Sequence, residues 1–354
     1  MLQLEDLCRH LIEHNASDLH LVVGVPPQLR IDGELYPMDL PPLTPEITKS
    51  LSYSILTERQ IKEFEKEKEL DMSFGIKGLS RFRVNLFIDR GSVTAAIRTI
   101  PYEVPGFEEL GIPKSVRDLA DRPLGLVLVC GPTGSGKSTT LAALLNKINL
   151  EQRCHILTIE DPIEYLHSHK MSIINQREVY ADTHSFAAAL KHILRQDPDV
   201  IMIGEMRDLE TIEAALTVAE TGHLVFATLH SNDATQSINR MVDVFPPHQQ
   251  VQVRTQLSFV LEGIIVQKLL PRKDGNGRVL AMEIMVATTA IRSLIREEKL
   301  HQIYSSISTG GGLGMQTMNQ SLYKLYKNGQ LSYEQALEAS SNQEDLLRLM
   351  GKGF

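Results

Sequence analysis

A glycine-rich segment is the feature that most constrains what this chain can fold into. It directly follows the apolar run Leu126–Cys130 and matches the phosphate-loop pattern G-x-x-x-x-G-K-[ST] at every position: Gly131, Pro132, Thr133, Gly134, Ser135, Gly136, Lys137 and Ser138. In such a loop the glycines let backbone N–H groups turn toward an anion, and the following helix directs its positive end at the same anion. The pattern predicts a strand, a loop and a helix, the last containing Thr139, that together bind nucleotide phosphates.

Two side chains of this loop have expected roles in binding ATP with Mg²⁺. Lys137 should reach the β- and γ-phosphate oxygens, and the Ser138 hydroxyl should hold Mg²⁺. The alternative is a glycine-rich turn that binds nothing. It is disfavoured because an apolar run precedes the loop and a helical sequence follows it.

Composition limits the class of protein. The chain has 354 residues, enough for two or three domains, and its 42% apolar and 23% charged residues are typical of a soluble globular protein. A formal net charge of −8 argues against a surface built mainly for nucleic acid. Cys8, Cys130 and Cys154 form no C-x-x-C pair and indicate neither a disulfide framework nor a zinc site. With no signal-peptide pattern and no bilayer-length apolar stretch, we expect a cytosolic protein.

Residues 1–100 are predicted to form a small α+β domain. It should contain helices at 4–14 and 58–69 and short strands at 18–23 and 28–33. Apolar and polar residues alternate along Arg81–Ile88, with Phe82, Val84, Leu86 and Ile88 on the apolar face, which indicates a half-buried strand. A turn at 89–91 and a second strand at 93–97 complete a hairpin that displays Arg81 and Arg83 on its polar face.

The remaining sequence divides into a linker, a core and a C-terminal region. Prolines and glycines mark residues 101–115 as a linker. Residues 116–270 contain four continuous apolar runs, at 126–130, 156–159, 200–203 and 224–229. Such runs are typical of a parallel sheet covered on both faces, whose ligands bind beyond the carboxyl ends of the strands. Residues 271–354 are expected to be mostly helical, with a flexible glycine-rich stretch at 309–314.

Carboxylates follow two of these expected strands. Glu160 and Glu164 come after the second run and could order a water or Mg²⁺, although acids also gather at helix N-termini for capping alone. Glu205 follows the third run, where phosphate-loop enzymes place the acid that polarises the attacking water. The alternative for Glu205 is a structural ion pair, for instance with Arg207.

Two histidines flank the fourth run. His223 precedes it and His230 follows it, so at about 3.3 Å per residue they lie roughly 23 Å apart and cannot both contact one phosphate. His230, at the carboxyl end, is the expected γ-phosphate sensor. His223 is assigned to packing or to a subunit interface.

Together these motifs resemble the secretion-type ATPases of the RecA-like class, and among them the retraction ATPases of type IV pili. Residues 131–138 resemble the family's Walker A motif, residues 160–164 its aspartate box, and residues 199–205 an atypical Walker B motif with glutamate in place of aspartate. The histidine box ending at His230 matches as well. So does the segment Ser80–Asn85, whose arginines resemble N-terminal arginines that approach nucleotide in the family.

A C-terminal segment carries a further resemblance. Ala290–Glu297 is similar to a motif typical of the retraction enzymes, with Ser293 where the family commonly has Asn. By this resemblance Leu294, Ile295 and Arg296 belong to a retraction motif. The same spacing of apolar residues is also what helix packing in a core produces.

The resemblance implies an α/β fold. A RecA-like phosphate-loop ATPase core would follow a smaller, PAS-like α+β domain, and a helical C-terminal region would pack with the core. Six identical subunits would form a ring that hydrolyses ATP with Mg²⁺, and Glu205 would orient water with help from Glu160 and Glu164. His230 would report the γ-phosphate, and Arg81 and Arg83 would supply positive charge to the transferred phosphoryl group.

The resemblance also implies partners and a location. Hydrolysis would power pilus retraction and twitching motility through an inner-membrane platform protein, with the ATPase at the cytoplasmic face of that membrane and held there by its partner. A paralogous retraction ATPase is a further expected partner. No stable binding of nucleic acid is expected.

Three alternatives stay open. A DNA-handling translocase can use the same core, although the acidic charge and the lack of aromatic–basic clusters count against it. A non-hydrolysing assembly subunit would not need Lys137, Ser138 and Glu205 together. An accessory retraction paralogue, or a motor for type II secretion or pilus assembly, fits the motifs. Secretion and assembly motors usually add an N-terminal domain and a four-cysteine zinc element, neither of which is recognised here.

Overall fold

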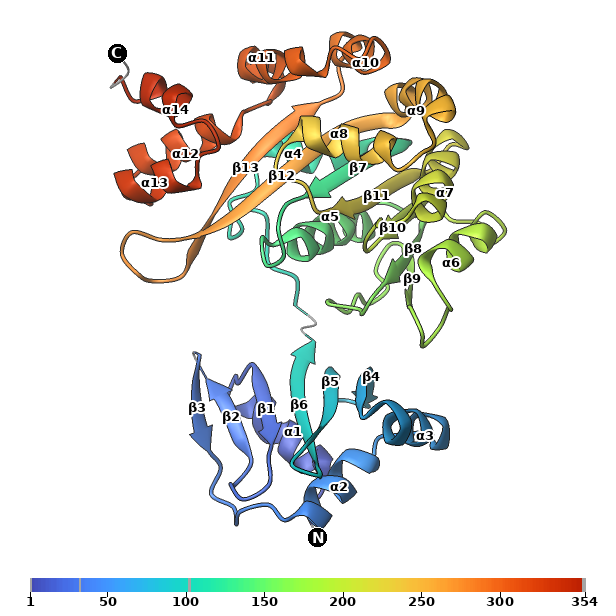
Figure 1. Cartoon of the computed structure of the whole chain (residues 1–354), viewed down its shortest axis with the longest axis vertical. Coiled ribbons are helices and arrows are strands. Elements are labelled where there is room, and N and C mark those ends of the chain that lie inside the picture. Colours follow the sequence, from blue (N-terminus) through green and yellow to red (C-terminus); the bar gives the residue numbers. More distant parts are fainter. Residues whose placement is uncertain (1, 32, 101–102, 352–354) are drawn as a thin grey trace. The chain divides into compact units, whose positions relative to one another are not determined.

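The computed structural model describes residues 2–31, 33–100 and 103–351. The chain forms two compact units, one of residues 1–103 with 162–166 and the other of residues 104–161 with 167–354 (Figure 1). Pro101 and Tyr102, part of the expected linker, lie outside the described residues. Within the described ranges, no helix is both long and apolar enough to cross a membrane.

The N-terminal unit is an antiparallel sheet with three helices, the α+β class expected. Its strand order is β3-β2-β1-β6-β5-β4. The strands are β1 (Asp18–Leu21), β2 (Gln28–Ile31), β3 (Glu34–Pro37), β4 (Glu69–Ile76), β5 (Ser80–Asp89) and β6 (Ser92–Ile100). The helices are α1 (Leu4–Glu13), α2 (Pro45–Tyr53) and α3 (Glu58–Glu67). Strands β3 and β4 and helix α2 were not predicted from the sequence.

The predicted hairpin is present as β5 and β6. Asp89 pairs with Ser92 across a two-residue turn, and Arg90 and Gly91 there have φ of 50° and 80°. Two positive φ values match the right-handed twist of the strands that the turn joins. The apolar face of β5 is buried as expected, except that Ile88 is 37% exposed because it lies beside the turn, at the end of the strand.

The larger unit is built on a seven-stranded sheet in the order β13-β12-β7-β11-β10-β8-β9. The strands are β7 (Gly125–Cys130), β8 (His155–Glu160), β9 (Ile173–Glu178), β10 (Val200–Ile203), β11 (Leu224–Leu229), β12 (Leu261–Pro271) and β13 (Arg278–Val286). The four predicted apolar strands are confirmed and are parallel to one another. Among the strand pairings described in this seven-stranded sheet, only β12–β13 is antiparallel.

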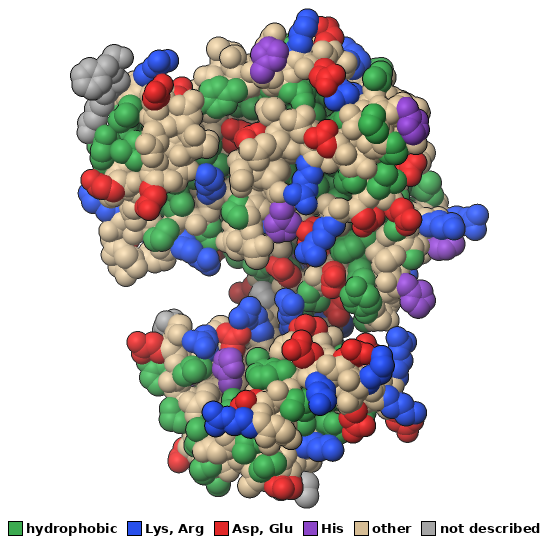
Figure 2. Space-filling model, in the orientation of Figure 1, with side chains coloured by type: hydrophobic (Ala, Val, Ile, Leu, Met, Phe, Trp, Pro, Cys, Tyr) green, Lys and Arg blue, Asp and Glu red, His purple; other side chains and the backbone are tan. Residues whose placement is uncertain are grey.

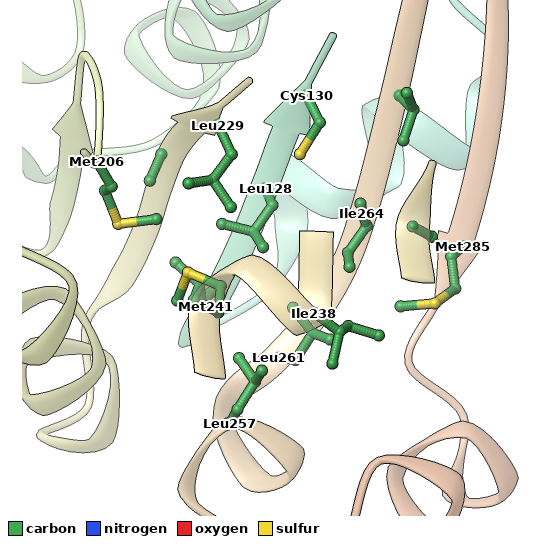
Figure 3. Packing of buried hydrophobic residues seen from close by; sticks show 14 of the residues in the cluster. Leu128, Cys130, Met206, Leu229, Ile238, Met241, Leu257, Leu261, Ile264 and Met285 are labelled. Atoms are coloured by element: carbon green, nitrogen blue, oxygen red, sulfur yellow. The ribbon is translucent and has the colours of Figure 1, made fainter. Parts of the chain in front are cut away.

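Helices cover both faces of this sheet. Successive residues of β7 point to opposite faces, and both faces are apolar. Leu126, Leu128 and Cys130 belong to one apolar cluster, and Val127 and Val129 to another. The first cluster is seen in Figure 3, where side chains of helices pack against Leu128, Cys130 and Leu229. The helices between strands are α4 (Lys114–Arg117), η1 (Asp118–Asp121), α5 (Lys137–Glu151), α6 (Phe186–Ile193), α7 (Leu209–Glu220), α8 (Ala234–Asp243) and α9 (Pro247–Val260).

The C-terminal region differs from the expectation in two places. Strand β13 lies within residues 271–354, which were expected to be mostly helical, because its apolar run pairs with β12 and extends the sheet. The stretch at 309–314, expected to be flexible, contains the 3₁₀ helix η3 (Gly310–Leu313), followed by the buried Met315. The other elements are α10 (Thr289–Arg296), η2 (Leu300–Gln302), α11 (Ile303–Thr309), α12 (Met318–Lys327), α13 (Tyr333–Ala339) and α14 (Gln343–Leu349).

Charged side chains on the face shown in Figure 2 are of mixed sign. Lys and Arg are interspersed with Asp and Glu over both units, and no large area of that face carries basic side chains alone. A single-sign basic surface is what nucleic-acid binding requires, so this face offers no support for a DNA-handling role.

The separate core of the N-terminal unit gives a stability prediction. Phe82 is fully buried and stacks on Phe74 with ring centroids 5.3 Å apart, so Phe82→Ala should lower the free energy of unfolding of this unit by about 3–5 kcal/mol. Ile88→Ala, on the same strand at a position that is 37% exposed, should change it by less than about 1 kcal/mol. Differential scanning calorimetry of the full chain measures both. Equal effects of the two variants would contradict the assignment of Phe82 to this core.

Candidate active site

The phosphate loop leaves the carboxyl end of β7 at a residue that must be glycine. Gly131 has φ of 138°, and a Cβ there would lie 2.5 Å from the Gln267 carbonyl oxygen and 2.6 Å from Ser135 Oγ. Gly134 and Gly136 also have positive φ, of 77° and 88°, but with open space around them. The loop is therefore pressed against β12 at its start and is open at its tip, where a phosphate can approach the backbone.

Lys137 begins α5 and spans the loop. Its Nζ donates hydrogen bonds to the carbonyl oxygens of Gly131 at 2.9 Å and Pro132 at 3.0 Å. Ser138 and Thr139 lie in the first turn of α5 and are half-buried. Ser135 Oγ is buried with no hydrogen-bond partner in the part of the chain that the structure describes. A buried, unpaired donor and an ammonium at a helix N-terminus fit an anionic phosphate group.

Ser138 is the expected ligand for Mg²⁺. Among the described residues, no group of three or more His, Cys, Asp and Glu side chains could form a complete metal site. Nucleotide-bound Mg²⁺ usually takes few protein ligands and draws the rest from phosphate oxygens and water. Binding of Mg²⁺ by Ser138 stays a prediction.

Parallel register brings the ends of four strands to one edge of the sheet. Cys130 of β7 pairs with Leu229 of β11, and Ile203 of β10 pairs with Ala227 of β11 and Ile159 of β8. The residues that follow these positions must therefore emerge close together. They include the phosphate loop, Glu205 and His230.

Glu205 and His230 are in direct contact. Glu205 Oε1 lies 3.1 Å from His230 Nε2 and also accepts a hydrogen bond from Arg207 Nε. Partial burial opposes ionisation of Glu205, but the bond from Arg207 and the charges of His230 and Lys137 outweigh burial and hold its pKa below the ordinary value. The ion pair with Arg207, considered from sequence as an alternative, is thus present together with the contact to His230.

The environment of His230 favours its neutral form. Burial and the positive charges of Lys137, Arg207 and Arg240 lower the pKa of His230, against the opposing charge of Glu205. Arg240 also donates from Nη1 to the His230 carbonyl oxygen at 3.1 Å. Because Lys137 acts on both Glu205 and His230, these three predicted residues share one electrostatic environment.

A hollow of about 380 Å³ lies beside Glu205. Its lining includes Asp161, Phe186, Arg207 and Glu210. The hollow gives solvent access to the side of the carboxylate, which a residue that orients water requires.

The two other predicted acids lie in different surroundings. Glu160 is 7% exposed, and its Oε1 accepts hydrogen bonds from Thr158 Oγ1 at 2.6 Å and Gln176 Nε2 at 3.1 Å. These bonds tie Glu160 into the β8–β9 pair. Glu164 is exposed and groups with Pro162–Leu166 in the N-terminal unit. Assistance to Glu205 by either acid stays a prediction.

The two predicted arginines differ within the N-terminal unit. Arg81 is half-buried and donates from Nη2 to Ser73 Oγ at 2.6 Å. Arg83 is exposed and pairs in register with Ser73 of β4 and Arg98 of β6. Of the two, Arg83 has the freer guanidinium to offer to an external anion.

His223 makes local structural contacts, one of the two roles assigned to it. Its Nδ1 lies 3.1 Å from both the Val218 carbonyl oxygen and Thr221 Oγ1, and its own carbonyl oxygen accepts from Gly125 N at 2.9 Å. These contacts close the turn between α7 and β11 and join it to the start of β7.

The expected retraction motif forms α10. Ile295 is fully buried, Leu294 is half-buried against the same core, and Arg296 is exposed with its guanidinium 5.9 Å from the centre of the Phe259 ring. Core packing therefore accounts for Ile295. Leu294 and Arg296 keep a surface that a partner can contact.

Gln267 and Arg240 were not predicted from the sequence. Gln267 is fully buried on β12, and its Nε2 donates to Thr140 Oγ1 on α5 at 2.7 Å while its carbonyl oxygen abuts Gly131. A Gln directly after the apolar run Ile264–Val266 is a weak signal for such a role. For Arg240, the second residue missed, no local pattern points to His230.

Comparisons with known proteins agree with this geometry. The profile of the family described as Type II/IV secretion system protein matches residues 2–338. The chain is 50% identical to the type IV pilus retraction ATPase PilT of Pseudomonas aeruginosa, over 97% of this chain and 100% of the relative. It is 49% identical to a twitching motility protein of Neisseria gonorrhoeae, over 90% and 86%, and 42% identical to the type IV pilus ATPase PilU of P. aeruginosa, over 99% and 92%.

A solved structure of the pilus retraction motor PilT with bound ADP also matches. It superimposes with a TM-score of 0.92 at 54% identity, over 98% of this chain and 100% of that one. The expected fold class is thereby confirmed, and the phosphate loop, Glu205 and His230 lie within the matched length. This chain belongs to the Type II/IV secretion system protein family.

Proposed function

We propose that this chain is a motor ATPase that powers retraction of a type IV pilus and, through it, twitching motility. One observation carries the proposal: Lys137, Glu205 and His230 share one electrostatic environment at the strand ends of a chain that aligns along nearly its whole length with a pilus retraction ATPase. A fold that only binds nucleotide would need Lys137 but would not need the contact between Glu205 and His230.

The groups of the site have separable tasks in hydrolysis. When ATP binds, Lys137 exchanges its two loop carbonyl partners for β- and γ-phosphate oxygens, and Ser138 holds Mg²⁺. Bound Mg²⁺ neutralises charge on the phosphates. Glu205 is ionised at neutral pH, since its pKa lies below the ordinary value, and it orients the attacking water. Arg207 and His230 hold the carboxylate in place.

Assembly and partners follow as proposals from the family. We expect a homohexamer at the cytoplasmic face of the inner membrane, acting on a pilus platform protein there and joined in the cell by a paralogous retraction ATPase. The higher identity to PilT, 50% against 42% to PilU of the same organism, favours the main retraction motor over the accessory paralogue.

Loss of the Glu205 carboxylate tests the proposal directly. Glu205→Gln should lower kcat for ATP by about 10²- to 10⁴-fold while nucleotide binding is retained, because the amide cannot take up a proton from water. In a strain that lacks the gene, the variant should leave cells with excess surface pili and no twitching. Steady-state ATPase assays, nucleotide titration and microscopy of pili measure these effects.

Glu210→Gln is the matched control, since Glu210 is exposed and lines the same hollow. It should keep both ATPase activity and motility. Cells without pili in the Glu205→Gln strain would point to extension instead of retraction, and wild-type turnover of that variant would remove Glu205 from the mechanism.

The N-terminal arginines make a second prediction. Positive charge brought to a departing phosphoryl group is worth about 10³ to 10⁵ in rate where an arginine supplies it, so Arg83→Ala should lower kcat by a factor in or near that range. Arg90→Ala, at the exposed turn of the same hairpin, should have wild-type kcat. Wild-type activity of Arg83→Ala in the same assay would exclude this role for Arg83.

The protonation of His230 gives a third prediction. Its lowered pKa means that His230 stays neutral as pH falls through 6.5, the ordinary histidine value, and gains a proton only at lower pH. Arg240→Gln removes one of the charges responsible and should shift the titration to higher pH. NMR titration of the Hε1 resonance in the nucleotide-free protein, assigned with His230→Gln, measures both midpoints.

Arg153→Gln is the control for that titration, since Arg153 is exposed and is not among the charges that act on His230. It should leave the midpoint unchanged. A wild-type midpoint above 6.5, or equal shifts in both arginine variants, would contradict the electrostatic account of His230.

A further inference from the structure

A buried carboxylate outside the active site lies at the starts of two helices. Glu283 lies on β13 and is 4% exposed. Its Oε1 accepts a hydrogen bond from Ala234 N at 2.8 Å, and the backbone N–H of Met318 helps to lower the pKa of this carboxylate. Ala234 is the first residue of α8 and Met318 the first residue of α12. One side chain thus binds the positive end of α8 and is stabilised by the positive end of α12, a helix far away in sequence.

The first of these helices carries the loop of His230. Only residues 230–233 separate β11 from α8, and the last of them, Asp233, caps α8 by accepting from Gln236 N at 2.8 Å. Arg240 of α8 binds the His230 carbonyl oxygen. The position of α8 therefore determines where this short loop holds His230, and Glu283 binds α8 at its first residue.

The second helix is held to β13 on both sides of Glu283. Ile284 N donates to the Gln316 carbonyl oxygen at 2.8 Å, and Gln316 N donates back to the Ile284 carbonyl oxygen at 3.1 Å. Met282 N donates to Ser321 Oγ at 3.0 Å. The start of α12 cannot move without β13, and the carboxylate of Glu283 extends this connection to α8.

Stability alone does not explain a carboxylate at this place. Burial and the charge of Asp233 raise the pKa of Glu283, while the bond from Ala234 N, the N–H of Met318 and the charge of Lys268 oppose that shift. Well-packed apolar residues often replace buried charges with no loss of stability. A carboxylate differs from them in accepting a hydrogen bond from the first N–H group of a helix.

We propose that Glu283 is a positioning residue for ATP hydrolysis: it fixes the loop of His230 against β13 and couples the position of His230 to α12. The inference rests on the proposed role of His230. The presence of the γ-phosphate at His230 is thereby transmitted through α8 and Glu283 to α12 in the C-terminal region.

Two variants remove the contact in different ways. Glu283→Gln keeps the shape of the side chain but replaces one carboxylate oxygen by an NH₂ group and removes the negative charge at the starts of α8 and α12. Ala234→Pro removes the α8 donor itself, at a first helical position where proline is tolerated and after Asp233, whose φ of −153° and ψ of 167° suit a residue before proline. Each should lower kcat by about 10- to 100-fold with KM for ATP within about twofold, since a displacement of roughly 1 Å can cost that much.

A double-mutant cycle with His230→Gln separates a role of Glu283 in positioning His230 from a general loss of rigidity in the protein. If Glu283 acts through His230, the variant Glu283→Gln/His230→Gln should be no slower than His230→Gln alone. Additive losses, or wild-type kcat in Glu283→Gln, would overturn the inference while leaving the role of His230 intact. Wild-type kcat in His230→Gln would instead remove the proposed role of His230, and the inference with it.

Thr317→Ala is the structural control. Thr317 caps α12 by accepting from Gln320 N at 3.2 Å, so its loss loosens α12 without touching the bond between Glu283 and Ala234. It should lower the thermal unfolding midpoint but keep kcat within about twofold of wild type, since it removes a single helix cap. A loss of kcat in Thr317→Ala as large as in Glu283→Gln would overturn the positioning role.

Hydrogen exchange tests the coupling to α12. Addition of the non-hydrolysable analogue AMP-PNP with Mg²⁺ should slow amide exchange at the start of α12 in the wild-type protein, and this effect should be absent in Glu283→Gln, while protection of the phosphate loop is kept. Equal slowing of exchange at α12 in both proteins, or none in the wild type, would overturn the coupling.

Discussion

The parallel register of β7, β11, β10 and β8 is the constraint on which the active site depends. In this sheet the carboxyl ends of neighbouring strands stop at one edge, so residues from separate motifs meet without any long connecting structure. A shift of one residue in the pairing of β10 with β11 would turn the side chains after Ile203 to the other face and part Glu205 from His230. Close packing of the buried side chains on both faces of β7, β10 and β11 opposes such a shift.

A second constraint ties the phosphate loop to the C-terminal half of the chain. Gly131 packs so closely on the Gln267 carbonyl oxygen that no larger residue fits, and the Gln267 side chain binds Thr140 on the helix after the loop. The same hairpin, β12 and β13, carries Glu283 to the start of α8. One hairpin therefore contacts both the segment expected to bind phosphate and the segment expected to sense it.

Short-range patterns account for what sequence analysis predicted correctly. The phosphate loop, the four apolar strands and the β5–β6 hairpin each have a local signature, and Glu205 and His230 were each placed correctly at a strand end. The contact between these two residues is seen only in the structure. Strand β12 has no such signature, because it begins at Leu261 directly after α9 ends at Val260, with no turn residue between them. Gln267, Arg240 and Glu283 were missed for a related reason. Their partners lie 127, 10 and 49 residues away in the sequence, and only the folded chain brings them together.

The surroundings of His230 suit its proposed role as a sensor of the γ-phosphate. Without nucleotide, burial and the charges of Lys137, Arg207 and Arg240 outweigh the charge of Glu205 and lower the pKa of His230. A γ-phosphate bound to Lys137 brings negative charge to the same place, and nearby negative charge raises the pKa of a histidine. Binding of the γ-phosphate therefore raises the pKa of His230, and its release lowers that pKa again. The loop of His230 is only four residues long, and it joins β11 directly to α8, which is bound to Glu283 at its first residue. A change in the hydrogen bonding of His230 is therefore passed on to α8.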